Sequence, residues 1–217
     1  MSVVGILAAG GSGERLGAER PKAFVVVGAR PLLEYSLDAL SAVCDRVVVA
    51  LPASPQSPVV SPQGVDSVSG GDSRSASVRN ALEVAPEASV VVVHDAARPL
   101  VTAELVRRCV DALGPGMDGA IAAAAMTDTV KEAAPDGRVL RTLDRSTLWR
   151  IQTPQVFRAD ILRRALDRDP SALAAATDDA SLVEEVGGVV HVVAAPPDNL
   201  KVTTEHDLKV AEVLLGR

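Results

Sequence analysis

Five short apolar runs, separated by segments with helical periodicity, constrain the fold of this chain more than any other feature of its sequence. The runs are Val3–Ala9, Val47–Leu51, Val90–Val93, Ala120–Met126 and Val189–Ala194. Strands that are apolar along their whole length are buried on both faces, which is typical of a parallel sheet covered by helices. The alternation of strands and helices therefore predicts an α/β fold with a three-layer, doubly wound, mostly parallel sheet and right-handed crossovers.

The segments between these runs each carry one apolar stripe. Leu33, Leu37 and Leu40 recur at helical spacing in one of them, and Thr102 and Thr204 are candidate N-caps for two others. The chain has 217 residues, which one α/β domain can hold. We therefore expect a single domain over residues 1–217.

The composition excludes several function classes. Hydrophobic residues make up 47% of the chain and charged residues 23%, enough for a core and a solvated surface, so general disorder is excluded. Aromatic residues make up only 2%, too few for a platform that stacks single-stranded nucleic acid. The net charge of −6 gives no global attraction to nucleic acid or to an anionic membrane. Neither is expected as a partner, and any anion site must be local.

The cysteines and the N-terminal residues indicate in which cellular compartment the protein is expected. Cys44 and Cys109 lie in apolar stretches and match no metal-ligand spacing, so we interpret them as buried, reduced thiols. The chain opens without a basic leader, and no run reaches the roughly eighteen apolar residues of a membrane span. We expect a cytoplasmic protein, and we assign no residue to a metal site.

Two polar segments interrupt the alternation of strands and helices. Pro52–Ser67 is rich in Pro and Ser and has no periodicity, which predicts a surface loop. In the second segment, residues 127–149, the turn sequence Pro135-Asp136-Gly137 lies between two short stretches, 129–131 and 139–141. This pattern predicts a hairpin that projects from the body of the domain.

A glycine-rich segment follows the first apolar run, at the kind of turn where an α/β sheet binds ligands. It contains Gly10, Gly11, Ser12 and Gly13, and glycines let main-chain amides approach a phosphate group. The spacing does not fit a dinucleotide fingerprint, because Leu16 occupies the third glycine position, and the G-K-[ST] of a P-loop is absent. The segment predicts an anion-binding turn of another kind.

Two cations, Arg15 and Lys22, follow this turn, and two interpretations of them stay open. They are either ordinary solvated side chains or groups that neutralise a triphosphate and a departing pyrophosphate. Because Pro21 disfavours helical backbone before it, Lys22 is not expected inside an ordinary helix. Two unit charges about 4 Å apart contribute roughly 4 kcal/mol at an effective dielectric near 20, so such cations can affect a rate.

Asp95 and Arg98 follow the run Val90–Val93, where the sheet rule places a ligand. The alternative is a surface ion pair. His94 is interpreted as a structural, hydrogen-bonding histidine, and no triad or metal-ligand cluster emerges from the sequence. Gly70-Gly71-Asp72 is likewise either a simple turn before a helix that starts near Ser75 or part of a ligand site.

Taken together and in order, these segments resemble one family over nearly the whole chain. The matching segments are residues 7–16, 21–24, 70–78, 93–99, 128–131, 152–155, 177–181 and 199–203. The glycine segment alone is similar to nucleotidyltransferases that activate sugar phosphates. The full set resembles the 2-C-methyl-D-erythritol 4-phosphate cytidylyltransferases of the non-mevalonate isoprenoid pathway, and Pro52–Ser67 replaces what is often a helical connection in that family.

The resemblance implies a Rossmann-like nucleotidyltransferase fold with a projecting β-arm and assigns roles to particular residues. For CTP binding the residues implied are Ala8, Ala9, Gly10, Gly11, Ser12, Gly13 and Ala96 at the ribose and phosphates, and Gly71, Asp72 and Ser77 at the cytosine. The catalytic residues implied are Arg15, Lys22 and Lys201. For the acceptor the residues implied are Asp95, Arg98, Thr129, Arg145, Thr153 and Thr177. The arm, at about residues 127–149, is expected to embrace a second subunit, so that Thr129 and Arg145 complete the partner's site in a homodimer.

The expected reaction is attack of the acceptor's 4-phosphate oxygen on the α-phosphorus of CTP, with release of pyrophosphate. The nucleophile is already anionic, so alignment and charge stabilisation are enough, with Mg²⁺ bound mainly through the CTP phosphates. Three alternatives stay open: a cytidylyltransferase for another polyol phosphate such as ribitol 5-phosphate, an inactive nucleotide-binding regulatory module, and, more distantly, an oxidoreductase.

Overall fold

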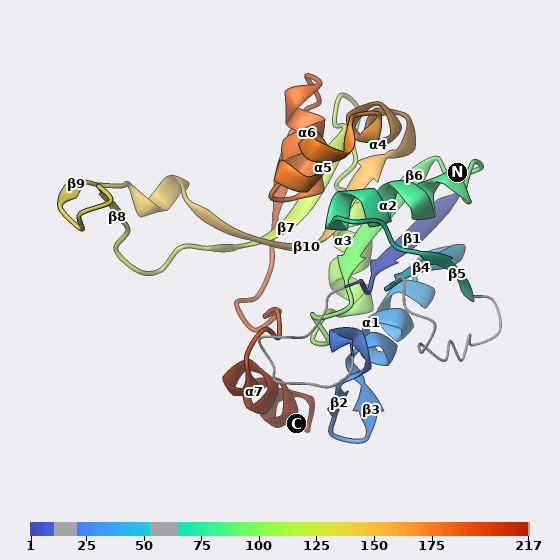
Figure 1. Ribbon diagram of the computed structural model, residues 1–217, viewed down its shortest axis with the longest axis horizontal. Helices are drawn as coiled ribbons and strands as arrows, with labels where there is room; N and C mark the ends of the chain where they lie inside the picture. Colours follow the sequence, from blue (N-terminus) through green and yellow to red (C-terminus); the bar gives the residue numbers. More distant parts are fainter. Residues whose placement is uncertain (11–20, 53–64, 217) are drawn as a thin grey trace.

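A seven-stranded sheet forms the centre of the protein in the computed structural model, which describes residues 1–10, 21–52 and 65–216 (Figure 1). The strand order is β11-β7-β10-β6-β1-β4-β5. The strands are β1 (Val3–Ala8), β4 (Arg46–Leu51), β5 (Val65–Ser69), β6 (Val90–Asp95), β7 (Gly119–Ala125), β10 (Trp149–Arg158) and β11 (Val190–Ala194). Each of the five apolar runs forms one of these strands, as predicted.

The sheet is mostly parallel, as the apolar runs predict. Each pair of neighbouring strands is parallel except the two pairs that β10 forms with β6 and β7. The sequence does not predict β10, because its apolar pattern begins only at Val156, after exposed and polar positions. It does not predict β5 either. The expected loop over Pro52–Ser67 is wrong at its end, because Val65 already pairs with Val47 of β4, and residues 53–64 lie outside the described residues.

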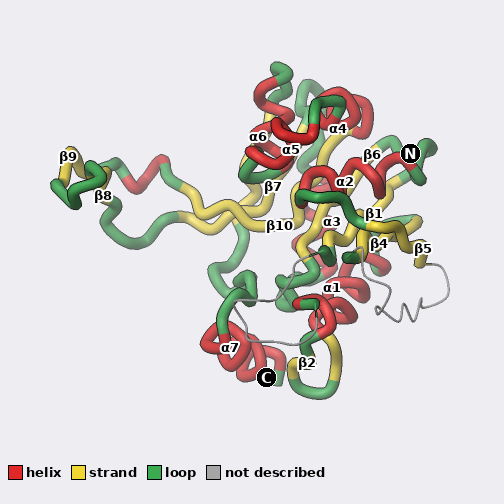
Figure 2. Tube along the Cα trace, in the orientation of Figure 1, coloured by secondary structure: helices red, strands yellow, loops and turns green. Residues whose placement is uncertain are grey.

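Helices cover both faces of the sheet and make three layers (Figures 1 and 2). One face carries α1 (Leu32–Ser41) and α3 (Ala103–Asp111), and the other carries α2 (Arg74–Glu83), α4 (Ala159–Leu166), α5 (Pro170–Ala175) and α6 (Asp179–Glu185). Strand β6 shows why the runs are apolar throughout. Val91 and Val93 pack on the α2 side, whereas Val90 and Val92 pack on the α1 side, and all four are buried.

The helix ends follow the predicted caps. The Thr102 side chain accepts a hydrogen bond from the Leu105 amide at the start of α3, and Thr204 forms a capping box with Asp207 at the start of α7 (Glu205–Leu215). Helix α7 packs near the short hairpin of β2 (Val26–Val27) and β3 (Arg30–Pro31) in a small apolar cluster. Within the described ranges, every helix is too short or too polar to span a lipid bilayer.

A hairpin of β8 (Lys131–Ala133) and β9 (Val139–Thr142) lies well away from the body of the molecule (Figures 1 and 2). Its turn includes Gly137 in the left-handed region, with φ of 86°, and the Arg138 amide donates to the Asp136 carboxylate at 3.0 Å. Both strands are exposed on every residue. Residues 127–148 thus form an extension from the sheet, termed the arm.

Candidate active site

The predicted site residues gather at the edge of the sheet where the parallel strands end. Ala8 at the end of β1 pairs with Asp95 at the end of β6. On its other side Ala8 pairs with Ala50 of β4, and the next residue of β4 pairs with Ser69 at the end of β5. The turns after β1, β5 and β6 therefore open on one edge, where parallel α/β sheets bind ligands.

The turn after β5 is held tightly against the first turn of α2. The Gly71 amide donates to Ser77 Oγ at 3.0 Å, and the Ser77 hydroxyl donates to the Ser73 carbonyl at 2.8 Å. Ser73 caps α2 by accepting from the Ala76 amide at 3.1 Å. A Cβ added at Gly71 would lie 2.6 Å from the Ala76 Cβ, so no side chain fits there. Asp72 is exposed on the same turn.

The start of the glycine-rich segment lies beside this turn. A Cβ added at Gly10 would lie 3.7 Å from Ser77 Oγ, and the Ala96 amide donates to the Ala8 carbonyl at 3.0 Å. Ala9 is buried next to them. The structure therefore brings together the described residues expected to bind CTP. Gly11, Ser12, Gly13 and the expected catalytic Arg15 lie outside the described residues.

Lys22, unlike Arg15, lies within the described residues. It is the first residue of a short 3-10 helix, η2 (Lys22–Phe24), directly after Pro21. As expected, it is not inside an α-helix. Pro21 has φ of −54° and ψ of 139°, so the chain is extended before it turns. The Lys22 side chain is half-buried.

A pocket of about 240 Å³ lies at the end of β6. Five residues expected at the acceptor site or in catalysis line it, namely Asp95, Arg98, Thr153, Thr177 and Lys201. They come from segments up to 106 residues apart in the chain. Thr129 and Arg145 do not line it, because both lie on the arm. There Arg145 Nη1 donates to the Thr127 carbonyl at 2.6 Å.

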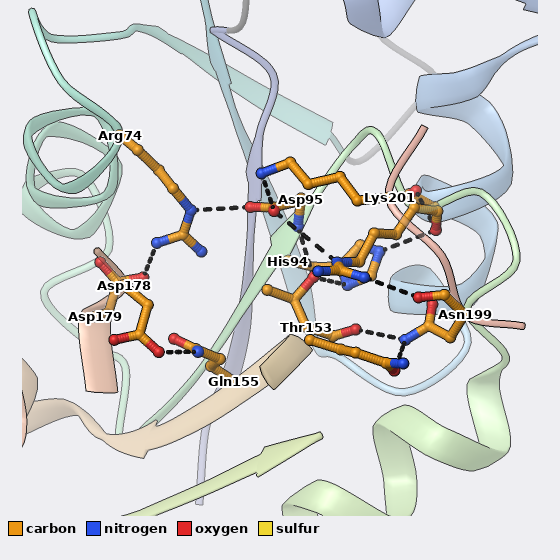
Figure 3. A network of polar contacts seen from close by, with 12 residues as sticks. Arg74, His94, Asp95, Thr153, Gln155, Asp178, Asp179, Asn199 and Lys201 are labelled. Atoms are coloured by element: carbon orange, nitrogen blue, oxygen red, sulfur yellow. Dashed lines mark hydrogen bonds and ion pairs between the residues drawn. The ribbon is translucent and has the colours of Figure 1, made fainter. Parts of the chain in front are cut away.

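Asp95 is the centre of the charges in this pocket (Figure 3). Lys201 Nζ lies 2.8 Å from Oδ2, Arg74 Nε lies 2.9 Å from Oδ1, and Arg98 Nε lies 4.0 Å from Oδ2. Burial by itself raises the pKa of the Asp95 carboxyl, but the charges of Arg74 and Lys201 outweigh it and hold this pKa well below its usual range. Asp95 is therefore ionised at neutral pH.

His94 and Thr153 form a hydrogen-bonded chain that holds the backbone amide of Asp95. The Asp95 amide donates to Thr153 Oγ1 at 3.1 Å, and Thr153 Oγ1 lies 2.9 Å from His94 Nδ1. His94 Nε2 lies 3.3 Å from the Arg98 carbonyl, which can only accept, so Nε2 carries the proton. Burial lowers the pKa of the His94 imidazole to about 4, so the ring is neutral and the Thr153 hydroxyl donates to Nδ1.

Arg98 is held by the segment that leads to Lys201. Arg98 Nη1 donates to the Asn199 carbonyl at 2.8 Å. Asn199 Nδ2 in turn donates to the Thr153 carbonyl at 2.9 Å and to Gln152 Oε1 at 2.8 Å. These bonds join the turn after β6, β10 and the chain before α7, so they hold Arg98 and the segment that carries Lys201 close to Asp95.

The site includes four residues to which the sequence analysis gives no role, namely Arg74, Gln155, Asp178 and Asp179. Arg74 Nη1 donates to Asp179 Oδ2 at 2.5 Å, and Gln155 Nε2 donates to Asp178 Oδ2 at 2.8 Å. All four lie inside the segments that carry the family resemblance, which was the available signal.

The described residues offer no ready-made metal centre. Across residues 1–10, 21–52 and 65–216, no group of three or more His, Cys, Asp or Glu side chains is placed to hold a metal ion. Both oxygens of Asp95 already have cationic partners. A divalent cation in this site would depend on ligand oxygens from a bound substrate, as Mg²⁺ often does.

Comparisons with known proteins find matches along the whole chain. The family model of 2-C-methyl-D-erythritol 4-phosphate cytidylyltransferase matches residues 3–217. The 2-C-methyl-D-erythritol 4-phosphate cytidylyltransferase of Nocardia farcinica is 44% identical over 222 residues, covering 100% of this chain and 95% of the relative. The protein of the same name from Rhodococcus jostii is 42% identical over 217 residues, covering 98% and 95%.

Solved structures with the same fold also match over nearly the full length of both chains. The crystal structure of 2-C-methyl-D-erythritol 4-phosphate cytidylyltransferase from Thermus thermophilus is similar with a TM-score of 0.84 at 34% identity, covering 100% of both chains. That of 4-diphosphocytidyl-2C-methyl-D-erythritol synthase from Anaerococcus prevotii gives a TM-score of 0.84 at 28% identity, covering 100% of this chain and 99% of the other. The expected α/β nucleotidyltransferase fold is confirmed.

Proposed function

The chain belongs to the 2-C-methyl-D-erythritol 4-phosphate cytidylyltransferase family, and from that premise we propose how its site works. The protein is a nucleotidyltransferase that moves the cytidylyl group of CTP to 2-C-methyl-D-erythritol 4-phosphate. The products are 4-diphosphocytidyl-2-C-methyl-D-erythritol and pyrophosphate, in isoprenoid precursor biosynthesis. CTP binds at the turns after β1 and β5, and the acceptor binds in the pocket at the end of β6.

One observation supports the acceptor site most strongly: the pocket combines cations with a carboxylate. Lys201 and Arg98 offer charge and donors to a phosphate group, Arg as a fork and Lys as a compact charge. The two oxygens of Asp95 have lone pairs beyond those that Arg74 and Lys201 occupy, so they can accept from hydroxyl groups. A polyol phosphate carries both kinds of group.

The reaction needs alignment more than proton transfer. An oxygen of the acceptor phosphate attacks the α-phosphorus of CTP in line, a new P–O bond forms, and the bond to pyrophosphate breaks. The attacking oxygen is already anionic, so no base is required, and the neutral, buried His94 serves only to hold Thr153. Arg15 and Lys22 stabilise the charge on the α-phosphoryl group and on pyrophosphate, and Lys201 holds the acceptor.

We also propose that Mg²⁺ enters the site bound to the phosphates of CTP. When bound, Mg²⁺ supplies charge neutralisation for the triphosphate. We expect the ion to be held mainly by phosphate oxygens, and no described side chain is assigned as its ligand. The chain's own part is to supply Lys22, Arg98 and Lys201 as fixed positive charges around the two anionic substrates.

The arm supports a proposal of a homodimer with shared sites. Its strands are exposed throughout, and Thr129 and Arg145 lie on it, away from the pocket of their own chain. A subunit-mixing assay tests this: Arg145→Ala and Lys201→Met proteins are each expected to be weakly active. Mixed after reversible dissociation, they should regain about a quarter of the wild-type sites, since half the dimers are hybrids with one intact site. Activity that stays at the level of the separate variants contradicts shared sites.

A cytoplasmic location is also proposed, on the state of the thiols. Cys44 and Cys109 are both buried and unpaired. Burial raises the pKa of each thiol to about 12, so neither reacts readily as a thiolate. Unpaired thiols of this kind fit a reducing compartment. Cell fractionation with detection of the protein checks the location.

Pyrophosphate release tests the function itself. The purified protein is given CTP and Mg²⁺ with 2-C-methyl-D-erythritol 4-phosphate, with ribitol 5-phosphate, or with no acceptor. Rapid release only with the first acceptor is the expected result. Faster release with ribitol 5-phosphate would reassign the acceptor, and CTP binding without release under any condition would indicate a regulatory module.

A further inference from the structure

Arg74 lies at one side of the polar network in Figure 3, between Asp95 and Asp179, and has no part in the proposed mechanism. It belongs to the first turn of α2, directly after the N-cap residue Ser73. Its Nε donates to Asp95 Oδ1 at 2.9 Å, and its Nη1 donates to Asp179 Oδ2 at 2.5 Å. One guanidinium group thus joins the start of α2, the end of β6 and the start of α6.

The α6 end of this bridge is firmly anchored. Asp179 is fully buried, so its carboxylate cannot follow a substrate. Its neighbour Asp178 caps α6 by accepting from the Ser181 amide at 2.9 Å, and it also accepts from Gln155 of β10 at 2.8 Å. The start of α6 is therefore fixed to the central sheet, and Arg74 is held from that side.

The Asp95 end of the bridge is the part that faces the acceptor pocket. Besides Arg74, Asp95 has Lys201 at 2.8 Å, from a side chain that is 41% exposed, and Arg98 at 4.0 Å. Arg98 is also tied to a buried residue, Asn199, but its Nε is 4.0 Å from Asp95, whereas Arg74 makes a 2.9 Å hydrogen bond and is anchored to the buried Asp179. Without Arg74, Asp95 Oδ1 loses its partner, and the carboxylate is held only through Oδ2, by the partly exposed Lys201 and by Arg98.

We propose that Arg74 is a positioning residue for the acceptor: it clamps Asp95 between α2 and α6 and so fixes the carboxylate that orients Lys201 and receives the acceptor's hydroxyl groups. The inference rests on the proposed function, since it concerns the acceptor of that reaction. The turn expected to bind cytosine is held by backbone groups and Ser77, not by the Arg74 side chain. Loss of that side chain therefore affects the acceptor and leaves CTP binding nearly unchanged.

Arg46 provides a matched control for Arg74. It bridges two carboxylates through the same two nitrogens, with Nε 2.7 Å from Asp66 Oδ2 and Nη1 2.9 Å from Glu87 Oε1, although these carboxylates are exposed and those of the Arg74 bridge are buried. It lies at the start of β4, on the opposite edge of the sheet from the site. Arg46→Met thus removes a similar ion-pair bridge without touching the pocket.

The first measurement compares steady-state constants for both substrates. Arg74→Met is expected to raise the acceptor KM on the order of 10- to 100-fold, because small misplacements of a positioning group have effects of this size. The CTP KM should stay within about twofold, and Arg74→Lys, which keeps a charge but loses the fork, should recover part of the loss. Arg46→Met should change neither constant.

The second measurement is the pH dependence of kcat/KM for the acceptor. The groups that face Asp95 are Arg74 from α2, Lys201 and Arg98, with neutral His94 next to it in β6. Beyond Arg74 lies Asp179, whose pKa is raised by burial, an effect that Arg74 opposes, so the Asp179→Asn variant separates its titration from that of Asp95. Burial raises the pKa of Asp95 and Arg74 opposes that effect. Arg74→Met should therefore move the acid limb to higher pH than in the wild type, whereas titration of the acceptor phosphate is common to both proteins.

The outcomes are distinguishable from failure of the proposed function. A wild-type protein that releases no pyrophosphate from CTP and the acceptor refutes the function itself. An active wild type, together with an Arg74→Met protein whose acceptor KM and acid limb match those of Arg46→Met, overturns the positioning role. So does an equal rise in both KM values. If Arg74→Met does not fold, Asp179→Asn loosens the same clamp while keeping Arg74 and Asp95, and it must raise the acceptor KM selectively.

Discussion

Replacement of Gly71 by alanine tests the nucleotide side of the site. The new Cβ would lie 2.6 Å from the Ala76 Cβ, whereas ordinary contact begins near 3.4 Å, so the turn must move by about 0.8 Å, the difference between these distances. Such a shift strains the 3.0 Å hydrogen bond from the Gly71 amide to Ser77 Oγ. Overpacking of this kind costs about 1–3 kcal/mol. If that cost falls on CTP binding, affinity decreases roughly 5- to 150-fold.

Two binding measurements, together with the melting temperature, separate this effect from a loss of folding. The KM for CTP comes from pyrophosphate release, and the Kd comes from calorimetric titration of CTP without acceptor. The control is Gly114→Ala, because a Cβ added at Gly114 meets no atom within 4 Å. A Gly71→Ala protein that melts like the control and binds CTP with wild-type affinity would refute the assignment of this turn to the nucleotide.

Three further predictions concern charges in and near the site. Lys201→Met should lower kcat/KM for the acceptor on the order of 10²- to 10³-fold with little change in Tm, since the side chain is partly exposed; an unchanged value contradicts its role. Lys22→Ala and Arg15→Ala should each lower turnover on the order of 10²- to 10³-fold, and near-normal turnover removes them from the mechanism. His94 is protonated more readily in the unfolded chain, because burial lowers its pKa from 6.5 to about 4 in the folded protein. The wild type should therefore lose up to about 3 kcal/mol of unfolding free energy as pH falls from 6.5 to 4, and His94→Gln should lose less; equal slopes in urea unfolding contradict this.

The sheet was largely predictable because its central parallel strands are buried on both faces, whereas the edge strands β5 and β11 are partly exposed. Burial of alternate residues on opposite sides leaves no room for polar positions, as Val90–Val93 illustrate. Strand β10 was not predictable by the same rule. Its middle turns into the site, where Gln152 and Thr153 make polar contacts with Asn199 and His94. Functional residues thus break the apolar pattern at the point where the strand serves the site.

The site was predictable only in part, for a similar reason. The ends of β1 and β6 locate it, and the resemblance to a family points to Asp95, Arg98 and Lys201. Arg74 has no local signal, because it stands between serines at a polar helix start and looks like a solvated side chain. Its partners Asp95 and Asp179 are 21 and 105 residues away, so only the folded chain shows that it is paired.

A structure with CTP, or a nonhydrolysable analogue, and the acceptor bound together tests the central claim most directly. The account predicts the acceptor phosphate within hydrogen-bonding distance of Lys201 Nζ and the Arg98 guanidinium, with a hydroxyl group on Asp95 and the cytosine at the Gly71 turn. Density for the acceptor outside this pocket, with Asp95 and Lys201 still paired only with each other and Arg74, would contradict it.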